Sequence, residues 1–141
     1  MNASNEELDL NYVCKSMLDN ADMRINLSQF PKVTLDVVVQ GTVDDKFWKV
    51  IFECRQVVQM NLEADDDIVS DELFMVLETN VNQYLKKDAE PAIRDRLDSL
   101  SMNDSFWTIE IFGHLSLKLV TTKFDWSLVE LTKNEYKSTY S

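Results

Sequence analysis

The feature that most constrains the fold of this chain is an alternation of apolar residues whose parity changes between two neighbouring stretches. An alternation of period two is typical of strands with one buried face. The alternating apolar residues have odd numbers in the first stretch and even numbers in the second. They can point to the same face of a sheet only if the numbers of opposed residues add up to an odd total, which requires an even number of loop residues. A loop over residues 42–45 meets this condition and predicts an antiparallel hairpin that opposes Val37 to Val50 and Val39 to Trp48. The apolar positions are Val33, Leu35, Val37 and Val39 in the first stretch and Trp48, Val50, Phe52, Cys54, Val58, Met60 and Leu62 in the second.

The second of these strands would be longer than strands usually are. It would cover about seventeen residues at about 3.3 Å each. We therefore expect a bend or bulge near Arg55 and Gln56.

The last third of the chain returns to period two. It contains two stretches whose apolar residues all have odd numbers. A hairpin between these stretches needs an odd number of loop residues, most simply residues 112–114 with Gly113 in a left-handed conformation. One continuous strand with a bulge is the alternative. A further strand is expected around Trp126, and residues 132–141 are expected to form a frayed tail. The two sets are Trp107, Ile109, Ile111 and Leu115, Leu117, Leu119.

Three segments carry helical patterns instead. Residues 5–19 begin with acidic residues and place apolar residues on one face. Residues 71–88 follow a good N-cap, Ser70, and residues 91–101 start at Pro91, which suits a first helical turn. The helical stripe of the second segment is Leu73, Val76, Leu77, Val81, Tyr84 and Leu85.

These patterns predict a single α+β domain over residues 1–141. Its antiparallel sheet would carry an N-terminal helix and two consecutive central helices packed on one face. A chain of 141 residues is long enough to bury a sizeable core.

Negative charge is concentrated in one segment of the chain. The formal net charge is −11, and seven of the 25 acidic residues lie between Glu63 and Glu78 with no Lys or Arg among them. Capping of the predicted helix accounts for Asp71 and Glu72, whereas the acids before them add repulsion without local benefit. A solvated loop is the alternative to a binding site. The candidate partner-binding residues are Glu63, Asp65, Asp66, Asp67, Asp71 and Glu72.

The sequence offers little for catalysis, cofactors or metals. It has two glycines and one histidine, His114, and it lacks nucleophile motifs and a complete EF-hand pattern. We expect no catalytic residue, no cofactor and no metal. The basic pairs Lys86–Lys87 and Arg94–Arg96 are offset by nearby acids, so we expect no nucleic-acid partner.

The remaining features indicate a cytoplasmic protein. The N-terminus is polar and acidic, and no apolar run is long enough for a membrane span. Cys14 and Cys54 sit in patterned apolar segments, which favours two buried, reduced thiols. The three tryptophans are expected in the core, with ligand platforms as the alternative.

Two stretches resemble the SecB-like export-chaperone family. Residues 30–36 (Phe-Pro-Lys-Val-Thr-Leu-Asp), followed by residues 44–52, resemble that family's Pro-x-Val-x-Leu-Asp strand and the strand after it. Residues 91–100, with Phe106 beyond, are similar to its Pro-x-x-Arg-Glu-x-Ile-x-x-Leu helix and the Phe that follows. The match covers about a third of the chain, which departs from the family in its strand count and its N-terminal helix. The resemblance implies an acidic homo-oligomer that holds unfolded or basic clients on apolar grooves.

The function expected from the sequence is therefore non-catalytic protein binding, as an acidic chaperone or holdase. The alternative is an acidic inhibitor, such as an immunity protein that neutralises a basic toxin, or a mimic of nucleic acid. In both cases the partner is a protein that is basic or unfolded.

Overall fold

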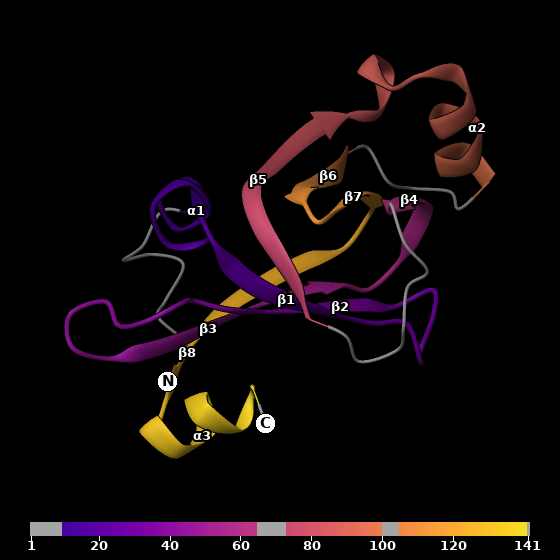
Figure 1. Cartoon of the computed structure of the whole chain (residues 1–141). Helices are drawn as coiled ribbons and strands as arrows, with labels where there is room; N and C mark the ends of the chain where they lie inside the picture. The colour runs from indigo at the N-terminus through magenta and orange to yellow at the C-terminus, as the bar shows by residue number, and fades with distance from the viewer. Residues whose placement is uncertain (1–9, 65–72, 100–104, 141) are drawn as a thin grey trace.

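The computed structural model describes residues 10–64, 73–99 and 105–140 of this α+β protein (Figure 1). One antiparallel sheet of eight strands dominates it, in the order β4-β7-β6-β5-β1-β2-β3-β8. The strands are β1 (Ala21–Asn26), β2 (Val33–Val38), β3 (Phe47–Cys54), β4 (Val57–Ala64), β5 (Phe74–Leu85), β6 (Ser105–Gly113), β7 (Leu115–Thr121) and β8 (Phe124–Leu131). The helical elements are α1 (Leu10–Tyr12), the π-helical turn η1 (Val13–Met17), the 3₁₀ turn η2 (Lys86–Asp88), α2 (Pro91–Ser99) and α3 (Lys133–Ser138).

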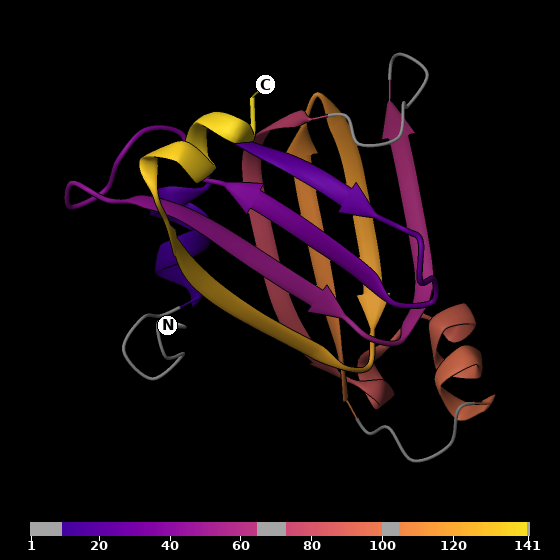
Figure 2. The ribbon, with the colours of Figure 1, turned by 90° about the horizontal axis from the view of Figure 1, so that it is seen from below.

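The sheet folds over on itself, so that β1, β2, β3 and β8 form one half and β5, β6, β7 and β4 form the other. Figure 2 shows the strands of the two halves crossing each other. Consecutive strands β3 and β4 lie in different halves, as do β7 and β8. At this corner the Arg55 amide donates to the Lys123 carbonyl at 2.9 Å, and the Thr122 amide donates to the Gln56 carbonyl at 3.1 Å. The predicted bend at residues 55–56 is therefore confirmed, as a break between two strands.

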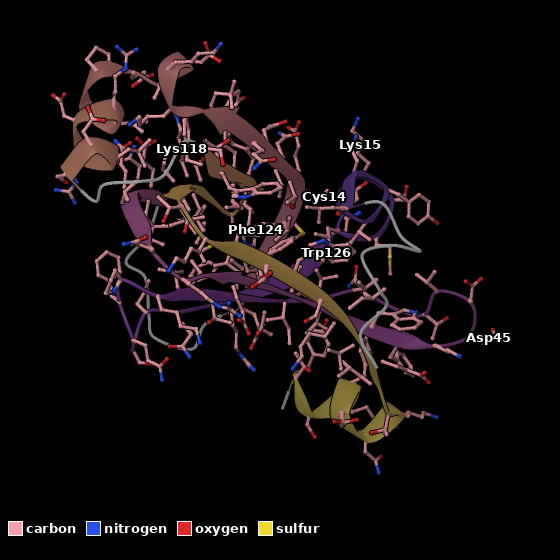
Figure 3. All side chains as sticks on the ribbon, turned by 180° about the vertical axis from the view of Figure 1, so that it is seen from behind. Cys14, Lys15, Asp45, Lys118, Phe124 and Trp126 are labelled. Atoms are coloured by element: carbon pink, nitrogen blue, oxygen red, sulfur yellow. The ribbon has the colours of Figure 1, made fainter. Side chains whose placement is uncertain are left out.

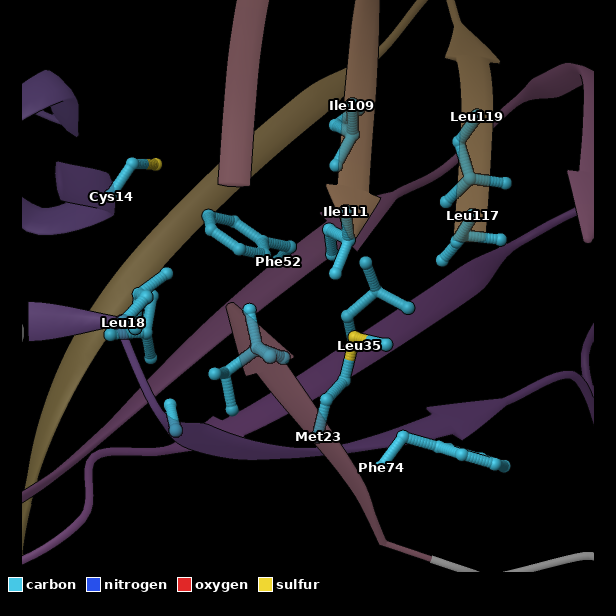
Figure 4. Packing of buried hydrophobic residues seen from close by; sticks show 14 of the residues in the cluster. Cys14, Leu18, Met23, Leu35, Phe52, Phe74, Ile109, Ile111, Leu117 and Leu119 are labelled. Carbon is cyan, nitrogen blue, oxygen red and sulfur yellow. The ribbon is translucent and has the colours of Figure 1, made fainter. Parts of the chain in front are cut away.

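The core lies between the two halves of the sheet (Figure 4). Phe52 and Leu35 from one half meet Ile109, Ile111 and Leu117 from the other, and all five are essentially inaccessible to solvent. The predicted apolar face of the N-terminal helix also joins this core, through Val13, Cys14, Met17 and Leu18. Only the part of that helix from Leu10 onward belongs to the described residues.

The hairpin predicted from parity is confirmed. Val37 opposes Val50, and the Val39 amide donates to the Trp48 carbonyl at 3.0 Å. The chain reverses at Asp44 and Asp45, which both have positive φ angles, of 55° and 62°. Two such residues are typical of a tight hairpin turn.

The predicted helix over residues 71–88 is wrong, because its described part is the strand β5 followed by η2. The register of β5 against β6 shifts between Val76 and Glu78. This bulge changes the spacing of the inward residues from two to three, and a spacing of three imitates a helical stripe. Of the two central helices expected in sequence, the structure has α2, which starts at Pro91 and buries Ile93 and Leu97. The proposed cap, Ser70, lies outside the described residues.

The β6–β7 hairpin has the predicted parity but a different centre. Ile111 opposes Leu117, which places the turn on His114. Gly113 does not have the expected left-handed conformation. A Cβ atom at Gly113 would instead clash with the Met75 carbonyl, which accepts a hydrogen bond from the His114 amide at 3.1 Å.

In place of the expected frayed tail, the described residues after Thr132 form the capped helix α3. The Thr132 hydroxyl and the Glu135 carboxylate form a reciprocal capping box. Tyr136 stacks on Phe47 at 4.2 Å, and its hydroxyl accepts a hydrogen bond from the Gly41 amide at 2.9 Å. The Tyr140 hydroxyl donates to Asp22 at 2.7 Å. These contacts hold α3 against the first half of the sheet.

Replacing Gly113 by alanine should be costly. Because the clash is with backbone that pairs in the sheet, we expect Gly113→Ala to lower the free energy of unfolding by about 2 to 3 kcal/mol. Gly41 has a φ of 75° with open space around it, so Gly41→Ala should cost about 1 kcal/mol through backbone strain alone. Urea denaturation measures both. A Gly113→Ala variant no less stable than Gly41→Ala would contradict the close approach to Met75.

The docking of α3 depends on Tyr136. Tyr136→Phe removes the hydroxyl that accepts from Gly41 but keeps the stacked ring, so we expect a loss of about 1 kcal/mol. Tyr136→Ala also removes the stacking and should cost about 2 to 3 kcal/mol in urea denaturation. Tyr12, which is 52% exposed, supplies the control Tyr12→Ala. Equal losses for Tyr12→Ala and Tyr136→Ala would mean that α3 does not dock.

Candidate functional site

The structure places one of the six predicted partner-binding residues. Glu63 lies near the end of β4 with its side chain exposed on the outer face of the sheet. The other five, Asp65, Asp66, Asp67, Asp71 and Glu72, lie outside the described residues. The candidate site is therefore built from what surrounds Glu63.

Two rows of side chains cross the outer face beside Glu63. Because opposed residues of antiparallel strands point to the same side, the register defines each row. The first row runs from β4 to β5 through Glu63, Ser116, Phe112 and Glu78, and the second through Asn61, Lys118, Glu110 and Asn80. We call residues 61, 63, 78, 110, 112, 116 and 118 the Phe112 surface.

Phe112 is the apolar centre of this surface. The alternation of β6 turns Ile109 and Ile111 inward, which turns Glu110 and Phe112 outward. The Phe112 side chain remains 40% exposed. A shallow pocket of about 220 Å³ lies beside it, lined by Asn61, Glu63, Glu110, Phe112, Ser116, Leu117 and Lys118.

Helix α2 covers one end of this outer face and, among the described residues, leaves the Phe112 end open. At the other end Phe106 is 3% exposed, because it packs with residues of α2 and stacks on Tyr84 at 5.7 Å. The cluster that covers it consists of Val58, Ala89, Ile93, Leu97, Phe106 and Val120. The helix is too short to extend over Phe112, and no other described residue buries it.

The Phe112 surface carries a negative charge. Its three carboxylates, from Glu63, Glu78 and Glu110, outnumber the single ammonium group of Lys118, so its formal charge is −2. Lys118 opposes Glu110 across the strands, but no ion pair within 4.0 Å joins them in the described residues. Figure 3 shows Lys118 and Asp45 at opposite ends of the molecule, so the acidic turn at Asp44 and Asp45 is not part of this surface.

The sequence contains a signal that points to this surface. Phe112 stands at a position where the alternation of residues 107–111 calls for an outward side chain, and outward positions are usually polar. An aromatic residue there, among Glu110, Ser116 and Lys118, departs from the usual polar pattern of outward positions. The candidate binding residues chosen by charge do not include Phe112.

The histidine and the three tryptophans occupy positions in a turn and around the core. His114 lies in the β6–β7 turn, and in the described part of the chain no three His, Cys, Asp or Glu side chains gather as a metal centre would require. The three tryptophans pack against the core, and the Trp48 indole donates to the Val43 carbonyl at 3.0 Å. Of the helices that the structure describes, none is long and apolar enough to cross a membrane.

Cys14 and Cys54 are both buried and form no disulfide, as predicted. Burial raises the pKa of the Cys54 thiol from its usual 9.0 to about 12. A thiol that stays protonated is a poor nucleophile, so Cys54 belongs to the packing of the core.

The raised pKa of Cys54 makes stability depend on pH. Between about pH 9 and pH 12 the native protein keeps the thiol proton and the unfolded chain loses it. Stability that is fully present below pH 9 is therefore lost as the pH rises, by up to about 1.4 kcal/mol per pH unit. The urea-unfolding free energy of the wild type minus that of Cys54→Val should fall with this slope above pH 9. A difference that does not change with pH would contradict the burial of a neutral thiol.

Comparison of the chain with protein-family models, with curated proteins and with solved structures gives no match.

Proposed function

We propose that this protein is a non-catalytic protein-binding protein and that the Phe112 surface binds basic, unfolded segments, in the manner of an acidic chaperone or holdase. The observation that carries the proposal is an exposed phenylalanine flanked by three carboxylates on an otherwise well-packed sheet. Apolar surface gives an unfolded segment a place to bury side chains, and carboxylates select segments that carry Lys or Arg. The SecB-like resemblance supports the same class of function.

Further exposed apolar residues lie on the neighbouring strand β5. Leu77 is 51% exposed at the bulge, and Tyr84 and Leu85 follow near the end of the strand. A holdase needs several weak apolar contacts rather than one deep pocket, because its clients differ in sequence. Leu77 and Tyr84 extend the candidate surface along β5, whereas Leu85 points to the opposite face of the sheet.

An acidic inhibitor of one basic protein is the second candidate. The observation that favours it is the pocket of about 220 Å³ beside Phe112, which has room for one side chain between Glu63 and Glu110. A guanidinium or ammonium group there could stack on the ring and pair with a carboxylate. Such an inhibitor would bind a single folded partner tightly, with an association rate that falls steeply as salt rises.

The binding surface can be tested with a labelled, unstructured peptide that contains Lys, Arg and Leu. Phe112→Ser should weaken its binding about tenfold or more, as expected for a central aromatic contact. Glu110→Gln should weaken it about threefold and reduce the dependence of binding on salt, because one attractive charge is lost. Fluorescence anisotropy at low and high salt measures both effects.

Two controls match these changes. Tyr12→Ser removes an exposed aromatic residue elsewhere, and Asp45→Asn removes one negative charge at the far end of the molecule. Both should stay within about twofold of the wild type. If Phe112→Ser binds as well as Tyr12→Ser, the Phe112 surface is not the site. Suppression of aggregation of several unrelated unfolded proteins would favour the holdase, whereas tight binding of one folded basic protein would favour the inhibitor.

A further inference from the structure

A bulge at the start of β4 shapes a second feature of the molecule. The register against β7 passes from Val57 opposite Thr121 to Gln59 opposite Val120, which leaves Val58 without a residue opposite it. Val57 packs in the core between the two halves, Val58 packs under α2, and Met60 returns to the core. The bulge thus places Val58 and Gln59 next to each other beside α2. Bulges commonly redirect side chains at binding sites.

A pocket of about 210 Å³ lies between this bulge and α2, lined by Val58, Gln59, Ala92, Ile93 and Arg96. Its floor is apolar, because Val58 and Ile93 are buried at 7% and 6% exposure. Ala92 and Arg96 are four residues apart and therefore lie on one face of the helix. Since a water molecule takes up about 30 Å³, the pocket has room for roughly seven non-hydrogen atoms.

Helix α2 forms one wall of the pocket, and two cations beside the pocket hold this helix in place. The Arg94 guanidinium donates to the carbonyls of Lys87 and Ala89, both at 3.0 Å. Lys86 forms an ion pair with Asp98 at 2.9 Å. These contacts tie α2 to η2, so the position of the helix over β4 does not depend on Arg96.

Arg96 is the cation at the rim of this pocket. Its guanidinium group makes no ion pair or hydrogen bond with another residue in the ranges that the structure describes. A guanidinium group offers five N–H donors in a planar arrangement that matches a carboxylate. An apolar floor with such a group at its edge suits a ligand that joins an apolar group to a carboxylate.

The edge of β4 leads to this pocket. β4 is the last strand of the sheet and pairs with β7 alone. At its other edge the Val57 amide donates to the Pro31 carbonyl at 3.0 Å, and from Gln59 onward no other described strand pairs with it. A free edge can accept an extended peptide through backbone hydrogen bonds. A peptide antiparallel to β4 would end at the start of β4, where the pocket lies.

We propose that this pocket binds the C-terminal residue of an extended peptide from a protein partner. Its apolar side chain packs on Val58 and Ile93, its terminal carboxylate pairs with Arg96, and its preceding residues add to the edge of β4. The pocket shares no lining residue with the Phe112 surface, although Asn61 and Glu63 of that surface lie farther along β4. Its cation selects a carboxylate, so binding there does not require Phe112.

The test uses two acetylated six-residue peptides of alternating Thr and Val that end in Leu, one with a free carboxylate and one with a C-terminal amide. Binding to the full chain is followed by ¹H–¹⁵N NMR titration, which also locates the site through the residues whose signals shift. We expect the free acid to shift signals of residues 58–63 and 92–97 and to bind about tenfold or more tightly than the amide, because a charge-assisted pair is lost. Arg96→Met should remove this difference.

Two variants make the test specific. Lys118→Met removes the same charge from the Phe112 surface and should leave the preference for the acid unchanged. Ala92→Trp should fill the pocket and weaken both peptides, while circular dichroism checks that the fold and the melting temperature of each variant are kept. Equal binding of acid and amide, retention of the preference in Arg96→Met, shifts confined to other strands, or no binding of the acid at millimolar concentration would each overturn the proposal. Phe112→Ser should not affect this binding, so a failure here is distinguishable from a failure of the holdase.

Discussion

The fold depends on the corner at which the chain passes between the two halves of the sheet. It does so twice at this place, from β3 to β4 and from β7 to β8. Arg55 and Gln56 break β3 from β4 at the place where Thr122 and Lys123 break β7 from β8. The buried Thr121 hydroxyl is held between the carbonyls of Gln56 and Lys123, at 2.9 Å and 3.1 Å. These contacts satisfy backbone groups that a bent ladder would otherwise leave unpaired. Without the corner, the inner face of an eight-stranded sheet would need another layer to cover it.

The same corner decides which surfaces are open. Once the two halves cover each other, each has one outer face, and short helices cover only parts of them. α3 packs at the end of the first half through Tyr136 on Phe47, and α2 covers Phe106 and Val120 on the second. Among the residues that the structure describes, none covers the Phe112 end of the second half or pairs with the outer edge of β4 from Gln59 onward. Both candidate binding sites thus lie where the described helices, which are short, leave the outside of a closed core exposed.

The sequence predicts the local pairing better than the helices and the sites. Parity determines the β2–β3 register, because a one-residue error would turn either Val37 or Val50 to solvent. Parity cannot locate a bulge, and the bulge at Leu77 makes β5 resemble a helix, because Leu77 and Val81 are four residues apart. The docking of α3 depends on contacts of Tyr136 and Tyr140 with residues about a hundred positions away, which no local pattern contains. The acidic run in the sequence identified Glu63 as a candidate binding residue. It could not identify Glu110 and Phe112, because they come close to Glu63 only through strand pairing.

The two outer faces differ in how their charges are balanced. On the first half Arg55 pairs with Glu53 and Asp125, and Lys46 pairs with Glu130. Such exposed pairs add little stability, but the two cations offset two of the three carboxylates that they contact. On the second half the Phe112 surface keeps an excess of carboxylates, while Arg96 lies without an ion pair among described residues at the α2 end. The Phe112 surface therefore combines an excess of negative charge with an exposed aromatic ring, which is where a basic partner would gain most from contact.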